Sequence, residues 1–243
     1  MNNLKIAVGT RYWGKAPEEI GVLKNFISQA TQISGLVFAA INVAEDKSQA
    51  IENPIAGADI FPVTPWQKFV PALNAIVFRA VQAGYSHLLL ASSTVSVTKE
   101  MVETLSGYMD SHTLVVGAAL EGHNFSETRF IFTANGKETP WNTLALWNLK
   151  YLSITGFLLA GDSPWNTDNA GVEELTTISA LQNLYRVNAK LINVPGVIWD
   201  TSNWDDDRKA MHDKKMATKI SRPESQLGFS SLHPPYVNHI RLT

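Results

Sequence analysis

The sequence contains no cysteine in its 243 residues. Disulfide bridges, thiolate metal sites and a cysteine nucleophile are therefore excluded, and the composition fits a reducing compartment. A charge excess of one sign is also lacking, because 20 basic and 22 acidic residues leave a net charge of −2. Nonspecific nucleic-acid-binding proteins are usually far more basic, so the sequence predicts no nucleic-acid partner.

Long apolar runs and targeting signals are lacking as well. No apolar segment approaches the roughly 18 residues that a membrane-spanning helix needs. Residues 1–5 do not have the basic and apolar regions of a signal peptide. We therefore expect no transmembrane segment and a cytoplasmic location. Glycine-rich phosphate loops, the nucleophile motif of hydrolases and helical zinc motifs are also missing.

The sequence does contain enough apolar residues, 45% of the chain, for a substantial core. Up to about residue 120, apolar strand-like segments alternate with segments of helical periodicity. The predicted strands are 4–10, 36–43, 59–63, 88–97 and 114–120, and the predicted helices are 17–30, 72–83 and one capped by Thr98. This alternation predicts a doubly wound, mostly parallel sheet with helices on both faces.

The second half of the sequence is less regular. The segments there are interpreted as a polar loop at 121–141, a helix at 142–152, a helix at 172–185, a strand at 190–194, a charge-rich helix at 205–220 and an irregular tail after Pro234. The charge-rich helix is typical of a solvated face, with a lid over the site as the alternative. We expect one domain over 1–243, with a first half to about residue 120, a second to about 200, and a C-terminal helix and tail.

Polar side chains stand at the ends of three of the predicted strands. They are Thr10, Arg11 and Tyr12 at the end of the first strand, Glu45 and Asp46 after the second, and Ser92, Ser93 and Thr94 toward the end of the strand that starts at Leu88. Ligands of doubly wound sheets bind at the carboxyl ends of the strands. These residues therefore indicate the expected place of a binding site.

The order of the segments resembles the GT-A fold of family 2 glycosyltransferases, over roughly residues 4–200. The similarity depends on the opening strand 5–12, the acidic loop 42–48, the segment 68–74, and the acidic pair Glu173 and Glu174 ahead of a helix and a strand that ends at Pro195. It implies a three-layer, Rossmann-like α/β fold. It also implies a nucleotide-diphosphate-sugar donor and a hydroxyl acceptor as partners, and it leaves the oligomeric state undetermined.

The same resemblance implies roles for individual residues. The nucleotide is expected to contact Thr10, Arg11, Tyr12, Glu45, Asp46, Lys68, Asn74, Ser92, Ser93 and Thr94. Trp141, Asn142 and Glu173 are expected beside the sugar and acceptor, with Trp141 stacked on a sugar face. Glu174 has the position of the general base, which deprotonates the acceptor hydroxyl.

The sequence departs from the family where paired aspartates should hold a metal. Ser92, Ser93 and Thr94 occupy that place, and hydroxyls are poor ligands for Mg²⁺ or Mn²⁺. Arg11, Lys68 or backbone N–H groups can replace the metal as counter-charge, acids elsewhere can hold it, or the domain binds without catalysis. The hypotheses are thus an inverting glycosyltransferase that can act without a metal, a silent module that binds nucleotide, sugar or protein, and a scaffold.

Overall fold

The computed structural model describes residues 4–13, 20–42, 55–127, 129–202 and 204–242. The strands of these residues form one nine-stranded sheet in the order β3-β2-β1-β4-β7-β5-β8-β9-β6. They are β1 (Ile6–Tyr12), β2 (Val37–Asn42), β3 (Ala58–Val63), β4 (His87–Ala91), β5 (Thr113–Ala118), β6 (Arg129–Phe132), β7 (Leu144–Asn148), β8 (Asn188–Ile192) and β9 (Tyr236–Ile240). All neighbouring pairs are parallel except those that involve β7 or β6.

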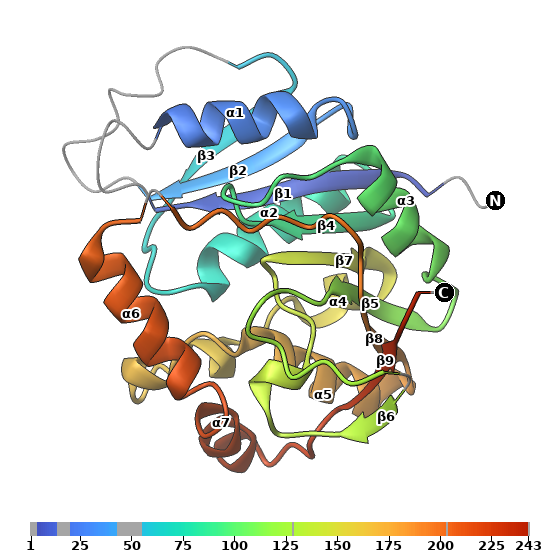
Figure 1. Cartoon of the computed structure of the whole chain (residues 1–243), viewed down its shortest axis with the longest axis vertical. Helices are drawn as coiled ribbons and strands as arrows, with labels where there is room; N and C mark the ends of the chain where they lie inside the picture. Colours follow the sequence, from blue (N-terminus) through green and yellow to red (C-terminus); the bar gives the residue numbers. More distant parts are fainter. Residues whose placement is uncertain (1–3, 14–19, 43–54, 128, 203, 243) are drawn as a thin grey trace.

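Helices cover both faces of this sheet (Figure 1). They are α1 (Ile20–Ala30), α2 (Val70–Gln82), α3 (Lys99–Gly107), α4 (Leu149–Thr155), α5 (Glu173–Tyr185), α6 (Asp206–Ala217) and α7 (Arg222–Ser230), with short turns η3 (Gly136–Glu138), η4 (Leu159–Asp162) and η5 (Thr167–Asn169). The predicted three-layer α/β architecture, mostly parallel with helices on both faces, is confirmed. No helix in the described ranges has both the length and the apolar character needed to cross a membrane.

Two hydrophobic cores lie on opposite faces of the sheet. Successive residues of β4 alternate between them, with Leu88 and Leu90 in the core under α2, α4 and α5, and Leu89 in the core under α1 and α3. Strands buried on both faces carry nearly continuous apolar runs, as a parallel sheet requires. Gly9 of β1 lets α2 approach closely, because a Cβ there would lie 2.5 Å from Cγ2 of Ile76.

The predicted helix at 142–152 is wrong in its first part. Residues Leu144–Asn148 form β7, which lies between β4 and β5 and runs antiparallel to both. Every residue of β7 is buried, so the strand lacks the alternation that distinguishes strand from buried helix. The helix α4 begins only afterwards, where Oδ1 of Asn148 accepts a hydrogen bond from the N–H of Lys150.

The polar loop predicted at 121–141 and the irregular tail predicted after Pro234 are also corrected. Four residues of the first segment form β6, and the tail contributes β9, which pairs with β8 on one side and β6 on the other. In β9, Val237 and His239 are buried while their neighbours are partly exposed. The tail is therefore part of the sheet, and its two prolines lie just before β9.

The strand predicted at 88–97 ends early, at Ala91, and a turn follows. The helix predicted after Thr98 is confirmed, with the Thr98 hydroxyl accepting from the N–H of Met101. The acidic first turn predicted at 17–19 lies outside the described residues. The other predicted strands and helices have counterparts within a few residues of their expected bounds.

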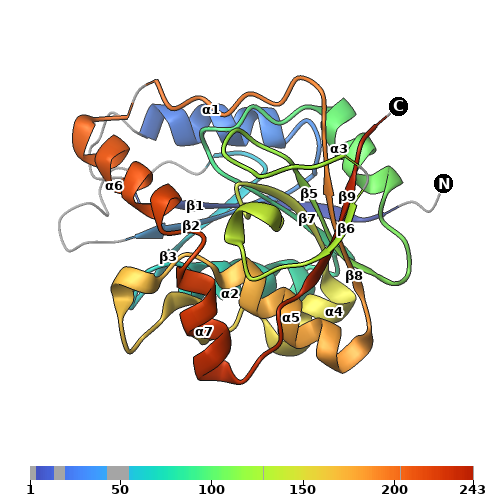
Figure 2. The same cartoon turned by 60° about the horizontal axis from the view of Figure 1, so that its bottom comes forward.

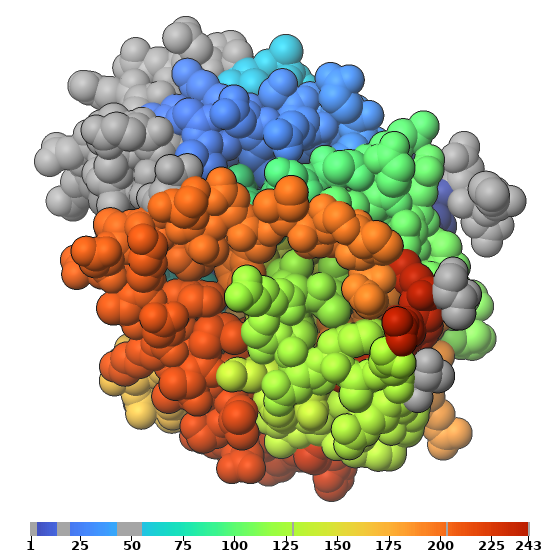
Figure 3. Space-filling view, in the orientation of Figure 1, coloured from blue at the N-terminus to red at the C-terminus, as the bar shows by residue number. Residues whose placement is uncertain are grey.

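The C-terminal segment lies across one end of the sheet. After β8 the chain passes along the front of the molecule to α6, and α7 follows (Figures 1 and 2). In the space-filling view this orange segment lies between the blue N-terminal part and the green middle part (Figure 3). Val95, just beyond β4, forms an isolated antiparallel bridge with Trp199 of this segment. The segment thereby closes over the carboxyl ends of β1 and β4.

Candidate active site

Two adjoining cavities lie at the carboxyl ends of β1 and β4. The first, of about 270 Å³, includes Glu173 and Glu174 of α5 and is called the α5 cavity. The second, of about 700 Å³, includes Asn25 and Gln29 of α1 and is called the α1 cavity. The residues that line both are Arg11, Phe69, Ser92, Trp204, Arg208 and Met211. A ligand with two ends can therefore occupy both cavities at once.

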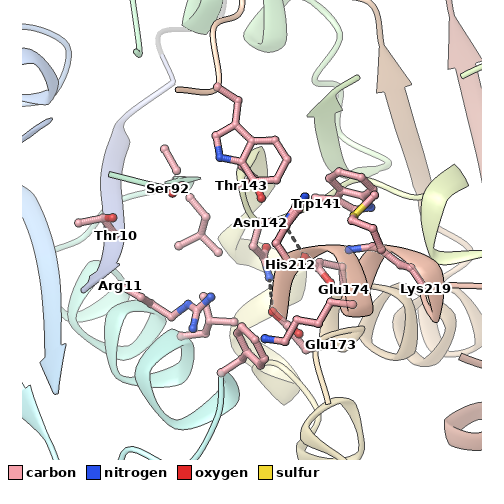
Figure 4. A pocket seen from close by; sticks show the side chains of 18 of the residues that line it. Thr10, Arg11, Ser92, Trp141, Asn142, Thr143, Glu173, Glu174, His212 and Lys219 are labelled. Carbon is pink, nitrogen blue, oxygen red and sulfur yellow. Dashed lines mark hydrogen bonds between the residues drawn. The ribbon is translucent and has the colours of Figure 1, made fainter. Parts of the chain in front are cut away.

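Two buried acids open helix α5 at the base of the α5 cavity (Figure 4). The backbone N–H of Asn142 donates to Oε1 of Glu174 at 2.8 Å, and its side-chain amide donates to Oε1 of Glu173 at 3.4 Å. The Nε1–H of Trp147 donates to Oδ1 of Asn142 at 2.9 Å, which fixes the amide orientation. The structure thus brings Asn142, Glu173 and Glu174 together, with both acids at a helix N-terminus that favours negative charge.

The environment of Glu174 makes it a candidate proton acceptor. Burial, together with the negative charge of Glu173, raises the pKa of Glu174 to about 7, while the charge of Lys219 and the N–H of Asn142 act in the opposite direction. A general base is most effective when its pKa lies near the working pH. Glu174 is therefore a candidate for that role.

Positive side chains face these acids from several elements. Arg11 of β1 is half-buried, and desolvation lowers its pKa against the opposing charges of Glu173 and Glu174. Burial also lowers the pKa of Lys215 of α6 to about 8, again opposed by Glu173. The guanidinium of Arg11 and the ammonium of Lys215 each lie 4.5 Å from the centre of the Phe69 ring. The basic residues of the α5 cavity outnumber its acids: Arg11, Arg208, Lys215, Lys219 and Arg222 against Glu173 and Glu174. The balance favours an anionic ligand.

Several buried polar atoms of this cavity have no partner within the described protein. They are Oγ1 of Thr10, Oε2 of Glu173, Nε1 of Trp204 and Nε of Arg222. A buried polar atom without a hydrogen bond is unfavourable by about 1–3 kcal/mol. All four atoms belong to residues that line the same cavity, which makes this cavity a candidate for a polar ligand.

The turn after β4 does not fit a divalent metal. The Oγ of Ser92 and Oγ1 of Thr94 lie 2.9 Å apart, and Nε1 of Trp199 donates to Thr94 at 3.2 Å. These hydroxyls are engaged with protein groups and lack the negative charge that Mg²⁺ and Mn²⁺ require. Among the described residues, no three His, Asp or Glu side chains are grouped to hold a metal. The predicted residues Glu45 and Asp46 lie outside the described part of the chain.

The other predicted nucleotide contacts separate into two groups. Thr10 lines the α5 cavity, while Tyr12, Ser93 and Thr94 line the α1 cavity. Lys68 is exposed and lines neither.

Asn74, a predicted nucleotide contact, makes two hydrogen bonds within the protein. Its side-chain amide donates to the carbonyl of Phe157 at 3.0 Å and accepts from the N–H of Phe157 at 2.7 Å. Both ends of the amide are used to attach α2 to the loop after α4. Asn74 lines neither cavity. The contact that the structure shows for it is a structural one, and its nucleotide contact stays a prediction.

The expected stacking of a sugar on Trp141 conflicts with its surroundings. The His123 ring stacks on it with centroids 3.6 Å apart, and the Lys219 ammonium lies 4.1 Å from the ring centre. Since the imidazole covers one face, the ammonium occupies the other. The Nε1–H of Trp141 donates to the carbonyl of Gly136. Trp141 lines the α5 cavity and holds Lys219 there, but offers no open face.

Sequence reasoning gave the charge-rich helix as a lid over the site only as the alternative to a solvated face, and it assigned none of the helix's residues to the site. The inward-facing members of α6 and the residues beside it, spaced by three or four residues, are Arg208, Met211, His212, Lys215, Lys219 and Arg222. The spacing places Arg208, Met211, His212 and Lys215 along one side of α6, while Lys219 lies in the turn that follows and Arg222 begins α7. The interpretation as a solvated face was based on the number of charged residues in 205–220. The regular spacing of the basic residues was the feature that could have indicated a face turned toward the site. Trp199 and Trp204, which also line the cavity, had no recognisable local pattern.

No protein-family model matches the sequence, and no curated protein sequence matches it. Solved structures of the same fold are nevertheless found. Glucosyl-3-phosphoglycerate synthase from Mycobacterium tuberculosis, solved with phosphoglyceric acid, has a TM-score of 0.55 at 13% identity, over 97% of this chain and 88% of that one. The mannosyltransferase PcManGT from Pyrobaculum calidifontis, solved with GDP-Man and Mn²⁺, has a TM-score of 0.54 at 12% identity, over 93% and 75%.

A third similar structure is S. aureus TarS 1-349 with UDP-GlcNAc, with a TM-score of 0.53 at 13% identity. The match covers 89% of this chain and 66% of that one. At these identities the similarity concerns the fold. The chain has the GT-A fold of nucleotide-sugar transferases, as the order of its segments predicted.

Proposed function

We propose that this protein transfers a sugar from a nucleotide-diphosphate donor to a hydroxyl acceptor, with inversion and without a required divalent metal. The observation that carries the proposal is Glu174, buried at the start of α5, with its pKa raised to about 7 in a cavity at the carboxyl ends of the sheet. The GT-A fold and the donors named in its structural neighbours, GDP-Man and UDP-GlcNAc, support the same reaction class.

In the proposed reaction the acceptor hydroxyl gives its proton to the carboxylate of Glu174 while its oxygen attacks the anomeric carbon. The bond from that carbon to the diphosphate oxygen breaks, and the nucleoside diphosphate leaves with the electron pair. Asn142 orients the carboxylate through its N–H, and the basic residues of the α5 cavity stabilise the charge of the leaving diphosphate. The proposal includes a cytoplasmic location, with which the lack of cysteine agrees.

A silent module that binds nucleotide, sugar or another protein is the second candidate. The hydroxyls of Ser92 and Thr94, which contact each other, favour it, because they stand where the family has its metal-binding acids. Such a module binds a donor and turns nothing over.

The experiment is to incubate the chain with UDP-, GDP-, CMP- and dTDP-sugars, in EDTA or with Mn²⁺, and to measure the thermal midpoint and nucleotide release. A bound donor raises the midpoint by mass action, equivalent to about 2.7 kcal/mol at a hundred times its Kd. Binding together with release that Glu174→Gln abolishes supports the transferase. Binding without release under any condition supports the silent module, and no binding contradicts both.

A further inference from the structure

The two cavities meet at a boundary that contains two arginines from distant parts of the chain. Arg11 belongs to β1, in the middle of the parallel half of the sheet, and Arg208 belongs to α6. Both line the α5 cavity and the α1 cavity. The Arg11 guanidinium packs 4.5 Å from the centre of the Phe69 ring, and that of Arg208 lies 4.5 Å from the centre of a Trp204 ring. Aromatic rings beside a guanidinium hold its plane and add cation–π attraction.

The shape of the site indicates what this boundary binds. A nucleotide sugar has a nucleoside at one end, a sugar at the other and a diphosphate between them. The α1 cavity, at about 700 Å³, is the larger and suits the nucleoside. The α5 cavity, at about 270 Å³, contains the proposed base and suits the reacting sugar. In this arrangement the diphosphate lies at the boundary, between Arg11 and Arg208.

We infer that Arg11 and Arg208 bind the diphosphate of the donor and take the place of a divalent metal, an inference that rests on the proposed function. A diphosphate ester carries two negative charges, and each guanidinium can contribute one positive charge and a bidentate pair of hydrogen bonds. The hydroxyls of Ser92 and Thr94, where the fold's metal-binding acids should stand, cannot provide that charge.

Two further groups, Trp204 at the boundary and Lys215 in the α5 cavity, have the matching polarity. Nε1–H of Trp204 is buried without a partner and can donate to a phosphate oxygen. Lys215 lies on the same helix as Arg208 and faces the same Phe69 ring as Arg11. We call Arg11 and Arg208 together the arginine clamp. Arg11 is fixed in the sheet, and Arg208 is provided by α6.

The inference is tested by calorimetric titration of the full chain with UDP, GDP, CDP and dTDP and with the matching monophosphates, in EDTA and with Mn²⁺. The principal variant is Arg208→Gln, which alters a peripheral helix and leaves the sheet intact. Lys209→Gln is the matched control, because Lys209 is the next residue of α6, is exposed and lines neither cavity. Arg11→Lys is the second variant, since it keeps the positive charge at the end of β1 and removes the forked donor.

We expect Arg208→Gln and Arg11→Lys to weaken the preferred diphosphate by about tenfold or more, since each loses charge-assisted hydrogen bonds. The monophosphate should change by less than about threefold, and Lys209→Gln should bind both ligands like the wild type. EDTA and Mn²⁺ should give the same wild-type Kd. Added salt should weaken diphosphate binding less in Arg208→Gln than in the wild type, because one fewer ion pair is screened.

Two results would overturn the clamp and leave the proposed transferase in place. They are wild-type diphosphate affinity in Arg208→Gln, and diphosphate binding that disappears in EDTA and returns with Mn²⁺. If the wild type binds no nucleotide under either condition, the proposed function itself fails and the clamp fails with it. Circular dichroism and the thermal midpoint of each variant distinguish loss of binding from loss of folding.

Discussion

The backbone N–H of Asn142 donates a 2.8 Å hydrogen bond to Oε1 of Glu174. This bond connects the residues before β7 with the first turn of α5. The side chain of Asn142 is held in turn by Trp147 of β7, which lies fully buried between β4 and β5. The orientation of the proposed base is therefore set by the middle of the sheet, as a preorganised site requires.

We predict that Glu174→Gln lowers the rate of sugar transfer by about 10²-fold or more, because the amide cannot accept the acceptor's proton. Donor affinity should change little, since the amide oxygen can still accept from the N–H of Asn142. Initial rates and donor titration measure the two quantities. Glu224→Gln is the control, because Glu224 is an exposed acid in the first turn of α7. Equal loss of rate in both variants would contradict a specific role for Glu174.

The raised pKa of Glu174 predicts opposite pH trends for activity and stability. Transfer should increase with pH up to about 7 and then level off, because only the carboxylate accepts a proton. The folded carboxyl binds protons more tightly than the unfolded one, whose pKa is near 4.5. Its contribution to the free energy of unfolding is therefore complete below about pH 4.5 and is lost as pH rises through about 7.

Urea unfolding of the wild type and Glu174→Gln at several pH values between these limits measures the difference in stability. The wild type should lose free energy of unfolding relative to the variant, with a slope of at most about 1.4 kcal/mol per pH unit. Parallel pH curves for the two proteins would show that burial does not raise this pKa.

Asn74→Ala is expected to reduce stability and leave nucleotide affinity unchanged. The substitution removes both hydrogen bonds to the backbone of Phe157 and leaves buried groups unpaired, with an expected loss of about 1–3 kcal/mol. Urea unfolding and nucleotide titration provide the two measurements. Gln82→Ala, at the exposed end of the same helix, should stay within about 0.5 kcal/mol. A specific loss of nucleotide affinity in Asn74→Ala would restore the role that the sequence first indicated.

Gly161 of η4 makes possible the close approach of the site's acids. A Cβ at this position would lie 2.3 Å from Cα of Glu173, so Gly161→Ala must displace the start of α5. We expect a loss of about 1–3 kcal/mol in stability and a fall in transfer rate larger than the fall in donor affinity. Gly228→Ala in α7, with no atom within 4 Å of the new Cβ, should instead stabilise by about 0.5–1 kcal/mol. Unchanged rate and stability in Gly161→Ala would contradict this account.

The parallel half of the fold could be predicted because each of its elements carries a local signal. Apolar runs form β1, β2 and β4, and helical periodicity forms α2 between them. β7 could not be predicted in the same way. Leu144 to Leu146 favour a helix by propensity, and only insertion between two strands makes them extended, which is a tertiary effect that no local pattern contains.

The residues of the candidate site also differ in whether a local sequence pattern could predict them. Glu173 and Glu174 could be identified because they adjoin a helix whose place in the fold was recognisable. Arg208 and Lys215 could not, since their role depends on where α6 lies over the sheet, and a charge-rich helix has the same sequence whether its basic face meets water or a cavity. Trp141 and Asn74 had the expected neighbourhood, but packing gave their polar and aromatic groups other partners.

The position of β9 has a consequence for the order in which this protein can be assembled. Within the described part of the chain, β6 pairs with β9 alone, although about a hundred residues separate them in synthesis. β6 therefore emerges from the ribosome long before its partner. Until β9 is synthesised, the backbone N–H and C=O groups of β6 have no strand to pair with. Contacts of such long sequence separation form slowly and leave unpaired edges open to aggregation. The pairing of β6 is therefore completed only when the C-terminal strand β9 is available.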